Sequence, residues 1–285
     1  MSKLQLKNIF SVIDDYDVFL FDLWGVINEG LSPYSNVVDI INRVIKQKRV
    51  FFVSNAPRPN VLIYQMIKNW GINVLPEMVI TSGETGAQMI NQSQVNFNIT
   101  NPIIYHLGSD RNKDIPTILP HPITTNIHEA NIMLITCYRE EFENLEEFDD
   151  FLRLVAKLNI INICANPDII APNEGMIRRC AGYFSQKLEQ FGGPVIYTGK
   201  PHKEIYNNVL NKIPNIPKNR ILMVGDTFHT DILGANRVGI DSALVLTGNA
   251  KAFHEQYHDM DEKLLQLKIA SIQENVMPNF VIQLT

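Results

Sequence analysis

The chain has 285 residues, a net charge of −5, 45% hydrophobic residues and 19% charged residues. These proportions are typical of a globular protein with a sizeable core, and the length allows one large domain or two ordinary ones. The negative net charge argues against a broad nucleic-acid-binding surface, which would need clustered lysine and arginine.

Short β-branched or aromatic runs alternate along the chain with longer segments of helical periodicity. The predicted strands are Val18–Leu23, Val50–Ser54, Ile103–Leu107, Ile132–Thr136, Ile160–Cys164, Val195–Thr198, Ile221–Val224 and Ala243–Leu246. Strands that are apolar throughout and separated by helices are typical of parallel sheets covered on both faces. The sequence therefore predicts an α/β fold.

Three helices are predicted most clearly. The segment SNVVDIINRVIKQK has its apolar residues on one helical face, and Ser35 is placed to cap its amino terminus. A second helix near Asn60–Trp70 ends at Gly71, where a left-handed backbone conformation is favourable. A third helix follows the predicted cap Asn144, and its apolar face contains Leu145, Phe148, Leu152 and Val155.

The middle of the chain differs from its ends. Residues 91–128 form an irregular region rich in Asn, Pro and His, and glycine-containing joints occur at TSGETG (81–86) and FGGP (191–194). Such joints on both sides of a block with its own strands and helices indicate an inserted domain. We expect an insert at 83–193, with 1–82 and 194–285 forming one discontinuous core.

The cysteines and the amino terminus bear on the location of the protein. Cys137, Cys164 and Cys180 have no CxxC spacing and are interpreted as reduced core residues. The first ten residues, MSKLQLKNIF, do not resemble a secretory signal, and no apolar run approaches the ~18 residues that a membrane span needs. We expect a cytoplasmic protein that binds neither membrane nor nucleic acid.

Polar groups stand at the carboxyl ends of four predicted strands. These groups are Asp22, Ser54 with Asn55, Lys200, and Asp226 followed by Asp231. Each one alone is more often a helix cap, a turn residue or a solvated side chain. In an open α/β sheet, however, ligands bind outside the carboxyl ends of the strands. Acids for Mg²⁺ with a hydroxyl, amides and an ammonium for phosphate oxygens together suit a phosphorylated substrate.

These segments resemble the four motifs of the haloacid dehalogenase superfamily, in the same order. The segments FLFDLWGVINEG, FFVSNAP, TGKPHKEIY and VGDTFHTDILGANRVGI are similar to the first, second, third and fourth motif. The likeness is to subclass IIA, the phosphatases of nucleotides, sugar phosphates, 4-nitrophenyl phosphate and pyridoxal phosphate. TSGETGA and ANPDIIAPNEG look like the segments that flank the α/β cap of this subclass. The resemblance implies a doubly wound, Rossmann-like parallel-sheet core with an inserted cap.

The resemblance also implies a mechanism and a set of roles. Asp22 corresponds to the nucleophile that forms an aspartyl-phosphate, and Ser54 and Lys200 correspond to the residues that stabilise the transferred phosphate, with the amides near Asn55. Mg²⁺ would be held by Asp22, the main-chain carbonyl of Trp24 and Asp226, with Asp231 as a supporting acid. The cap would close over the site and select the leaving group.

The first motif departs from the family pattern at Trp24. The family normally has a second aspartate there, which protonates the leaving group and later activates water. The indole N–H donates a hydrogen bond but does not titrate, so Trp24 can do neither. Loss of general acid–base catalysis is worth about 10²–10⁴-fold in rate. The metal site is unaffected, because this position contributes only its backbone carbonyl.

Three interpretations follow. The chain is a phosphatase for good leaving groups, or one that borrows a base, for which His229, Glu29 and His202 are candidates, each more often a solvated residue. Alternatively, it binds phosphate and Mg²⁺ with little or no turnover, as a sensor or regulatory subunit. A nucleotide-binding or receiver-like module is the weakest alternative, because no strand is followed by GxGxxG and the glycine spacing of GGPVIYTGKP does not fit a Walker A loop.

The substrate expected from these motifs is a small phosphorylated metabolite, such as a sugar phosphate or nucleotide. Its identity depends on cap residues that face the site, and the plausible neighbours of the cleft are Tyr138, Arg139, Asn166 and Asp168. Because caps of this subclass often take part in dimer contacts, a homodimer is compatible with the resemblance.

Overall fold

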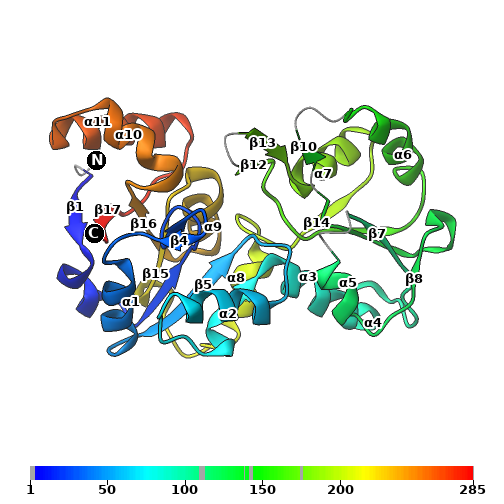
Figure 1. Ribbon diagram of the computed structural model, residues 1–285, viewed down its shortest axis with the longest axis horizontal. Helices are drawn as coiled ribbons and strands as arrows, with labels where there is room; N and C mark the ends of the chain where they lie inside the picture. The colour runs from blue at the N-terminus through cyan, green and yellow to red at the C-terminus, as the bar shows by residue number, and fades with distance from the viewer. Residues whose placement is uncertain (1–3, 109–112, 138, 141–143, 174–175, 285) are drawn as a thin grey trace. The chain divides into compact units, whose positions relative to one another are not determined.

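The computed structural model describes the chain except for a few short segments (Figure 1). The segments outside the description are residues 1–3, 109–112, 138, 141–143, 174–175 and 285. The described chain folds as two compact units. The first unit comprises Met1–Ser54, Val61–Ile80 and Lys200–Thr285, and the second unit comprises Asn55–Asn60 and Thr81–Gly199.

The first unit is built on a seven-stranded sheet. In sheet order, its strands are β1 (Leu6–Asn8), β17 (Phe280–Gln283), β16 (Asp241–Val245), β15 (Ile221–Gly225), β2 (Val18–Phe21), β5 (Arg49–Ser54) and β6 (Val79–Thr81). The pairs from β1 to β5 in this order are parallel. A short hairpin of β3 (Asn28–Glu29) and β4 (Ser32–Pro33) follows β2. The central strands are buried on every residue because both faces are covered.

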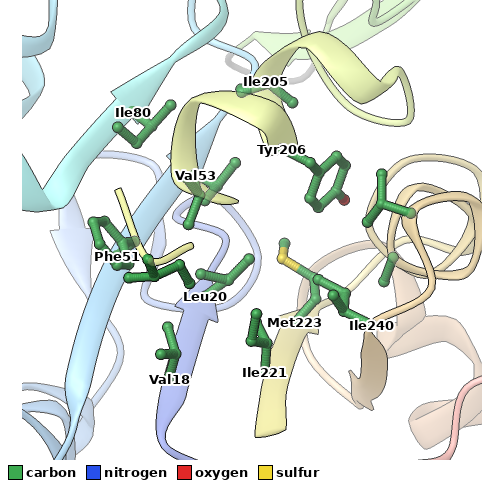
Figure 2. Close-up of a cluster of buried hydrophobic side chains, with 14 residues drawn as sticks. Val18, Leu20, Phe51, Val53, Ile80, Ile205, Tyr206, Ile221, Met223 and Ile240 are labelled. Carbon is green, nitrogen blue, oxygen red and sulfur yellow. The ribbon is translucent and has the colours of Figure 1, made fainter. Parts of the chain in front are cut away.

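Helices pack on this sheet from both sides. They are α1 (Val37–Ile45), α2 (Asn60–Asn69), α8 (Lys203–Leu210), α9 (Leu233–Val238), α10 (Lys251–Gln256) and α11 (Met260–Gln273). Figure 2 shows Val18 and Leu20 of β2 packed with Tyr206 of α8 in one apolar cluster. Phe19 and Phe21 point to the opposite face, since side chains alternate along a strand, and their stacked rings lie 6.1 Å apart. The predicted doubly wound α/β fold is confirmed.

The second unit has its own parallel sheet. In sheet order, its strands are β14 (Val195–Tyr197), β11 (Ile161–Cys164), β9 (Ile132–Ile135), β7 (Ile104–Leu107) and β8 (Ile123–Thr124). A separate antiparallel sheet contains β10 (Arg139–Glu140), β13 (Met176–Arg179) and β12 (Ile170–Asn173). The helices are α3 (Ser82–Asn91), α4 (Ser93–Phe97), α5 (Asp114–Ile118), α6 (Glu147–Val155) and α7 (Ala181–Gln190). Within the described residues, no helix of either unit is long and apolar enough to cross a bilayer.

One predicted strand lies in the other unit. We expected Val195–Thr198 to belong to the core, but β14 pairs with β11, and Val195 lies opposite Asn162. The chain returns to the first unit only after Gly199. The FGGP segment instead makes the tight turn between α7 and β14, in which Gly192 has a φ of +91°.

Several local predictions are also corrected. The first helix begins at Val37, and its N-cap is Asn36, with a φ of +63°, in place of Ser35. The N-cap of α6 is Glu146, whose backbone N–H donates to the side chain of Asn144. The chain enters the second unit at Thr81, so TSGETG lies at the predicted junction, but it is helical: the Thr81 side chain caps α3 by accepting from Glu84 N–H. The region 91–128 contains the predicted strand as β7, and the part expected to be irregular also contains α4, α5 and β8.

Candidate active site

The polar strand ends of the first unit lie at one edge of its sheet. Phe21, the last residue of β2, lies opposite Val224 of β15 and opposite Phe52 of β5. Asp22 follows directly, and its backbone N–H donates to Val224 O over 3.0 Å. Because the three strands are parallel and in this register, Asp22, Asp226 and Ser54 leave the sheet at the same edge.

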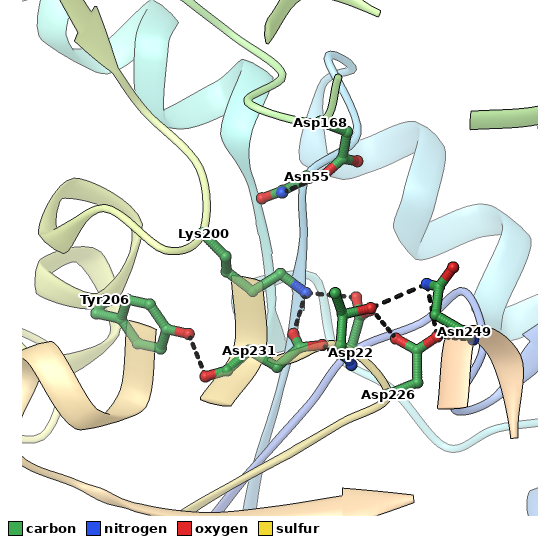
Figure 3. A network of polar contacts seen from close by, with 9 residues as sticks. Asp22, Asn55, Asp168, Lys200, Tyr206, Asp226, Asp231 and Asn249 are labelled. Atoms are coloured by element: carbon green, nitrogen blue, oxygen red, sulfur yellow. Dashed lines mark hydrogen bonds and ion pairs between the residues drawn. The ribbon is translucent and has the colours of Figure 1, made fainter. Parts of the chain in front are cut away.

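Three carboxylates and one ammonium form the centre of the site (Figure 3). Carboxylate oxygens of Asp22, Asp226 and Asp231 all lie within 4.8 Å of one another. Lys200 Nζ lies 2.6 Å from Asp22 Oδ1 and 2.8 Å from Asp231 Oδ1. Lys200 and Asp231 are 1% and 0% exposed. The sequence placed these four residues at one site, and the structure brings all four together.

The charges in this cluster do not balance. Burial raises the pKa of Asp22 well above its ordinary value, against the opposing effect of Lys200. Burial and the neighbouring Asp231 raise the pKa of Asp226 to about 6. Burial alone would lower the pKa of Lys200, but Asp22 and Asp231 raise it above its ordinary value. Three carboxylates against one ammonium form a set of hard oxygen donors with excess negative charge, which fits a divalent cation.

Asp231 is held by the turn that follows β15. A single π-helical turn spans Phe228–Ile232, and Thr227 N–H donates to Asp231 Oδ2 over 3.2 Å. The hydroxyl of the buried Tyr206 donates to the backbone carbonyl of Asp231 over 3.2 Å. A Cβ on Gly225 would lie 2.1 Å from Asp231 Cβ, so only glycine fits where the acid packs on the strand end.

A loop after β16, which the motifs did not indicate, contacts the same carboxylates. Asn249 donates from its backbone N–H and from Nδ2 to Asp226 Oδ2, over 2.6 and 2.8 Å. Thr247 donates from Oγ1 to the carbonyl of Gly25 over 2.5 Å. The signal that could have found this loop is a polar LTGN segment at the carboxyl end of another apolar strand.

The turn that carries Trp24 is well defined. Ile27 N–H donates to Leu23 O and Gly25 N–H donates to Asn28 O, both over 2.8 Å. Gly25 has a φ of +85°, and a Cβ there would lie 2.2 Å from Asp226 Oδ2, so the turn requires glycine. The Trp24 side chain is 37% exposed. An indole thus stands two residues after Asp22, partly open to solvent.

Ser54 and Asn55 lie where the chain passes from one unit to the other. Ser54 is the last residue of β5 and is half-buried, while Asn55 is buried and belongs by its contacts to the second unit. Asn55 Nδ2 donates to Asp168 Oδ1 over 2.8 Å, and Asp168 N–H donates to Asn166 Oδ1 over 3.1 Å. The expected cleft residues Asn166 and Asp168 therefore meet Asn55.

Two other expected cleft residues cannot be placed in the same way. Tyr138 lies outside the described residues, and Arg139 is described only as backbone, at the start of β10.

The three candidate bases have different surroundings. The imidazole of His229 is 65% exposed and lies 3.6 Å from a carboxylate oxygen of Glu274. His202 precedes α8, and burial, with a smaller contribution from Arg237, lowers its pKa to about 4. Glu29 is exposed on β3. The nearest printed acid to the His229 imidazole, Glu274, therefore lies outside the cluster of three carboxylates.

Comparison with known proteins agrees with this geometry. Residues 19–115 match a model of the haloacid dehalogenase-like hydrolases, and residues 197–265 match a HAD-hydrolase-like model. The chain belongs to the haloacid dehalogenase superfamily. This confirms the prediction from the four motifs, and with the relatives below it makes the chain a phosphatase of subclass IIA.

Individual relatives of this haloacid dehalogenase-like chain extend over most of its length. An acid sugar phosphatase of Staphylococcus epidermidis is 25% identical over 236 residues, which is 82% of this chain and 87% of the relative. A haloacid dehalogenase-like hydrolase from Brucella suis has a TM-score of 0.72 and 27% identity, covering 86% of this chain and 94% of that one. A possible sugar phosphatase from Cytophaga hutchinsonii has a TM-score of 0.77 and 23% identity, covering 98% of both chains, and shows the shared fold.

Proposed function

We propose that the chain is a Mg²⁺-dependent phosphatase that hydrolyses a small phosphorylated metabolite through an aspartyl-phosphate on Asp22. The observation that carries this proposal is the position of Lys200 Nζ, 2.6 Å from Asp22 and 2.8 Å from Asp231, beside the third carboxylate of Asp226. A buried lysine among three acids at the carboxyl edge of a parallel sheet is a site for an anionic group and a cation together.

The first half-reaction follows from the positions of these side chains. An oxygen of Asp22 attacks phosphorus, the new O–P bond forms, and the bond to the leaving oxygen breaks. Lys200 and the hydroxyl of Ser54, with backbone N–H groups near Asn55, stabilise the charge on the transferred phosphoryl oxygens. Water then attacks the aspartyl-phosphate and releases inorganic phosphate, which regenerates the Asp22 carboxylate.

The acids supply the ligands for the cation. Asp22, Asp226 and the main-chain carbonyl of Trp24 would hold Mg²⁺, with Asp231 as the supporting acid. When bound, the ion neutralises charge on the carboxylates and on the phosphate. Support for a cation comes from the unbalanced charge of the cluster, in which the pKa of Asp226 is raised to about 6 by burial and by Asp231.

Trp24 sets the expected rate. An indole cannot protonate the leaving oxygen or deprotonate water, so both half-reactions lose general acid–base assistance, worth about 10²–10⁴-fold. We expect substrates with good leaving groups to react best. The name of the Staphylococcus relatives supports a sugar phosphate as the natural substrate. The second unit would act as the cap that selects the substrate. The protein would act in the cytoplasm.

The test is an assay of the purified chain with 4-nitrophenyl phosphate and a panel of sugar phosphates and nucleotides. We expect activity that needs Mg²⁺ and is abolished by Asp22→Asn. The matched control is Asp39→Asn, which makes the same change on the exposed surface of α1 and should leave activity unchanged. Activity that survives both a chelator and Asp22→Asn would contradict the proposal.

A second candidate function is favoured by Trp24 itself. A chain that retains the acidic cluster and lacks the acid–base residue could bind phosphate and Mg²⁺ with negligible turnover, as a sensor or regulatory subunit. This alternative predicts tight binding of a fluoride-type phosphate mimic at Asp22 and no turnover of any substrate in the panel. Measurable turnover of 4-nitrophenyl phosphate would rule it out.

A further inference from the structure

The Asp226 carboxylate accepts two hydrogen bonds from one neighbouring residue, Asn249. Asn249 donates to Asp226 Oδ2 twice, from the backbone N–H over 2.6 Å and from Nδ2 over 2.8 Å. The same Nδ2 lies 2.9 Å from Thr227 Oγ1, which in turn donates to Asp226 Oδ1 over 3.0 Å. The amide orientation is fixed by its partners, because a carboxylate oxygen only accepts and so must face the nitrogen.

The two oxygens of this carboxylate are therefore unequal. An ionised carboxylate oxygen has about two acceptor positions. On Oδ2 both positions are taken by the two donors of Asn249, whereas on Oδ1 one is taken by Thr227. Asp226 is 2% exposed, so these donors replace water around the carboxylate. An acceptor position remains on Oδ1.

Backbone packing encloses the same oxygen. A Cβ added to Gly25 or to Gly248 would lie 2.2 Å from Asp226 Oδ2. Gly248 has a φ of +55°, and the loop after β16 lies against the turn after β2. The Thr247 hydroxyl donates a hydrogen bond from this loop to the carbonyl of Gly25 in the turn. Two glycine backbones and Asn249 thus surround Oδ2 and leave it no room for a further ligand.

We propose that Asn249 is a positioning residue that restricts Asp226 to one ligand oxygen, Oδ1, and thereby favours Mg²⁺ over Ca²⁺. This inference rests on the proposed Mg²⁺-dependent function. Mg²⁺ demands near-octahedral geometry with one oxygen from each carboxylate, whereas Ca²⁺ accepts higher coordination numbers and bidentate carboxylates. A carboxylate whose second oxygen is occupied by fixed donors suits the smaller ion.

The test compares the affinities of the two ions for the full chain without substrate. Metal-free wild type and Asn249→Leu are titrated with Mg²⁺ and with Ca²⁺ by calorimetry. Leucine has nearly the same size and removes the side-chain donors only. We expect the dissociation constant for Mg²⁺ to rise about tenfold, as for other residues that orient a metal ligand. The constant for Ca²⁺ should change by about threefold or less, because its flexible coordination tolerates a less firmly oriented Oδ1.

Controls separate this inference from the proposed function. Asn249 is exposed, so neither Asn249→Leu nor a second variant, Asn249→Ala, removes core packing, and thermal unfolding without metal verifies the fold. Asn207→Leu makes the same change on the exposed surface of α8 and should alter neither constant. Unchanged Mg²⁺ affinity in both Asn249 variants, or an equal loss for both ions, would overturn the role of Asn249. A wild type that binds neither ion would overturn the proposed function instead.

Discussion

The two units contain parallel sheets that end in different chemistry. Asp22 and Asp226 follow β2 and β15 of the first unit and meet Lys200 there, whereas neutral polar groups on strands of the second unit contact one another. In the second unit, His106 Nε2 lies 2.6 Å from Thr136 Oγ1, and Thr198 Oγ1 donates to Ser82 O over 2.8 Å. Among the described residues, the acids that could hold a metal ion gather only in the first unit.

This difference shows what makes a sheet edge reactive. Parallel strands bring their carboxyl ends together in both units, so the edge alone provides proximity. Charge that is buried and incompletely compensated is found at the first edge, where one lysine faces three acids. At the second edge, burial lowers the pKa of His106 to about 4, with a smaller contribution from Lys113, and the imidazole is neutral at neutral pH. The chemistry depends on which residues follow the strands.

The largest effect is expected from removing the Lys200 ammonium at the sheet edge of the first unit. Lys200→Met leaves buried carboxylates unpaired, so we expect a loss of about 3–5 kcal/mol in the free energy of unfolding and at least ~10²-fold in activity. Added Mg²⁺ should restore part of the stability, because it replaces the missing positive charge. Thermal unfolding and a 4-nitrophenyl phosphate assay measure both. Lys203→Met, on the exposed start of α8, is the control and should change neither. A fully stable Lys200→Met chain would remove the distinction between the edges.

A second change adds the missing carboxylate to the first edge. Trp24→Asp should raise turnover of sugar phosphates, which have poor leaving groups, by up to about 10²-fold, because an acid–base residue then assists both half-reactions. Turnover of 4-nitrophenyl phosphate should rise less, since its leaving group needs little protonation. Steady-state kinetics on the two substrates measures the contrast. Trp24→Asn controls for the loss of the indole, and an equal gain in that variant would mean that the indole obstructs the site.

The pH dependence of stability should have opposite signs at the two edges. The raised pKa of Asp226, about 6, makes the folded state bind more protons than the unfolded state from about pH 4 to 6, so stability falls as pH rises. The lowered pKa of His106, about 4, makes the unfolded state bind more protons up to about pH 6.5, so stability rises with pH. Each contribution is at most about 3 kcal/mol.

Denaturant unfolding of the metal-free chain at several pH values tests these signs. Relative to wild type, Asp226→Asn should remove the falling contribution and His106→Gln the rising one. The same direction of change in both variants would show that the two edges do not differ in the way described.

The smallest expected effect lies at the second edge. Thr136→Val removes the hydroxyl that meets His106 and keeps the shape of the side chain, so we expect a loss of about 1 kcal/mol in stability. Phosphatase activity at saturating 4-nitrophenyl phosphate should not change, because the pair takes no part in the reaction. A large fall in kcat without loss of stability would give this edge a role in catalysis.

Much of the fold was predictable because a strand that is buried on both faces appears in the sequence as a continuous apolar run. The eight apolar runs all form strands, and α2 ends at Asn69, just before Gly71, which has a φ of +88°. An apolar run does not indicate which of the two sheets the strand belongs to. The residues of β14 are as apolar as those of a core strand, and its pairing with β11 depends on where the chain crosses between the units.

The site was predictable where a charge interrupts an apolar strand. Asp22 and Asp226 follow buried strands, and Lys200 follows β14. Three charged residues at the ends of apolar strands are not needed for folding, so together they indicate a functional site. Asn249 and Thr247 gave no comparable signal, because asparagine, glycine and threonine are ordinary loop residues. Their role emerges only when the loop after β16 is seen against Asp226 and Gly25. The local sequence pattern identifies the charged ligands, whereas the residues that orient those ligands are identified only from interatomic distances in the folded structure.

The most direct measurement of the central claim is the covalent state of Asp22 during turnover. The chain is mixed with 4-nitrophenyl phosphate and Mg²⁺, quenched in acid and digested, and its peptides are analysed by mass spectrometry. We predict a phosphoryl group on the peptide that contains Asp22, accumulating because Trp24 cannot activate the water that would remove it. Release of nitrophenol with no phosphoryl group on Asp22 at any time point, or with one on another residue, would contradict the account.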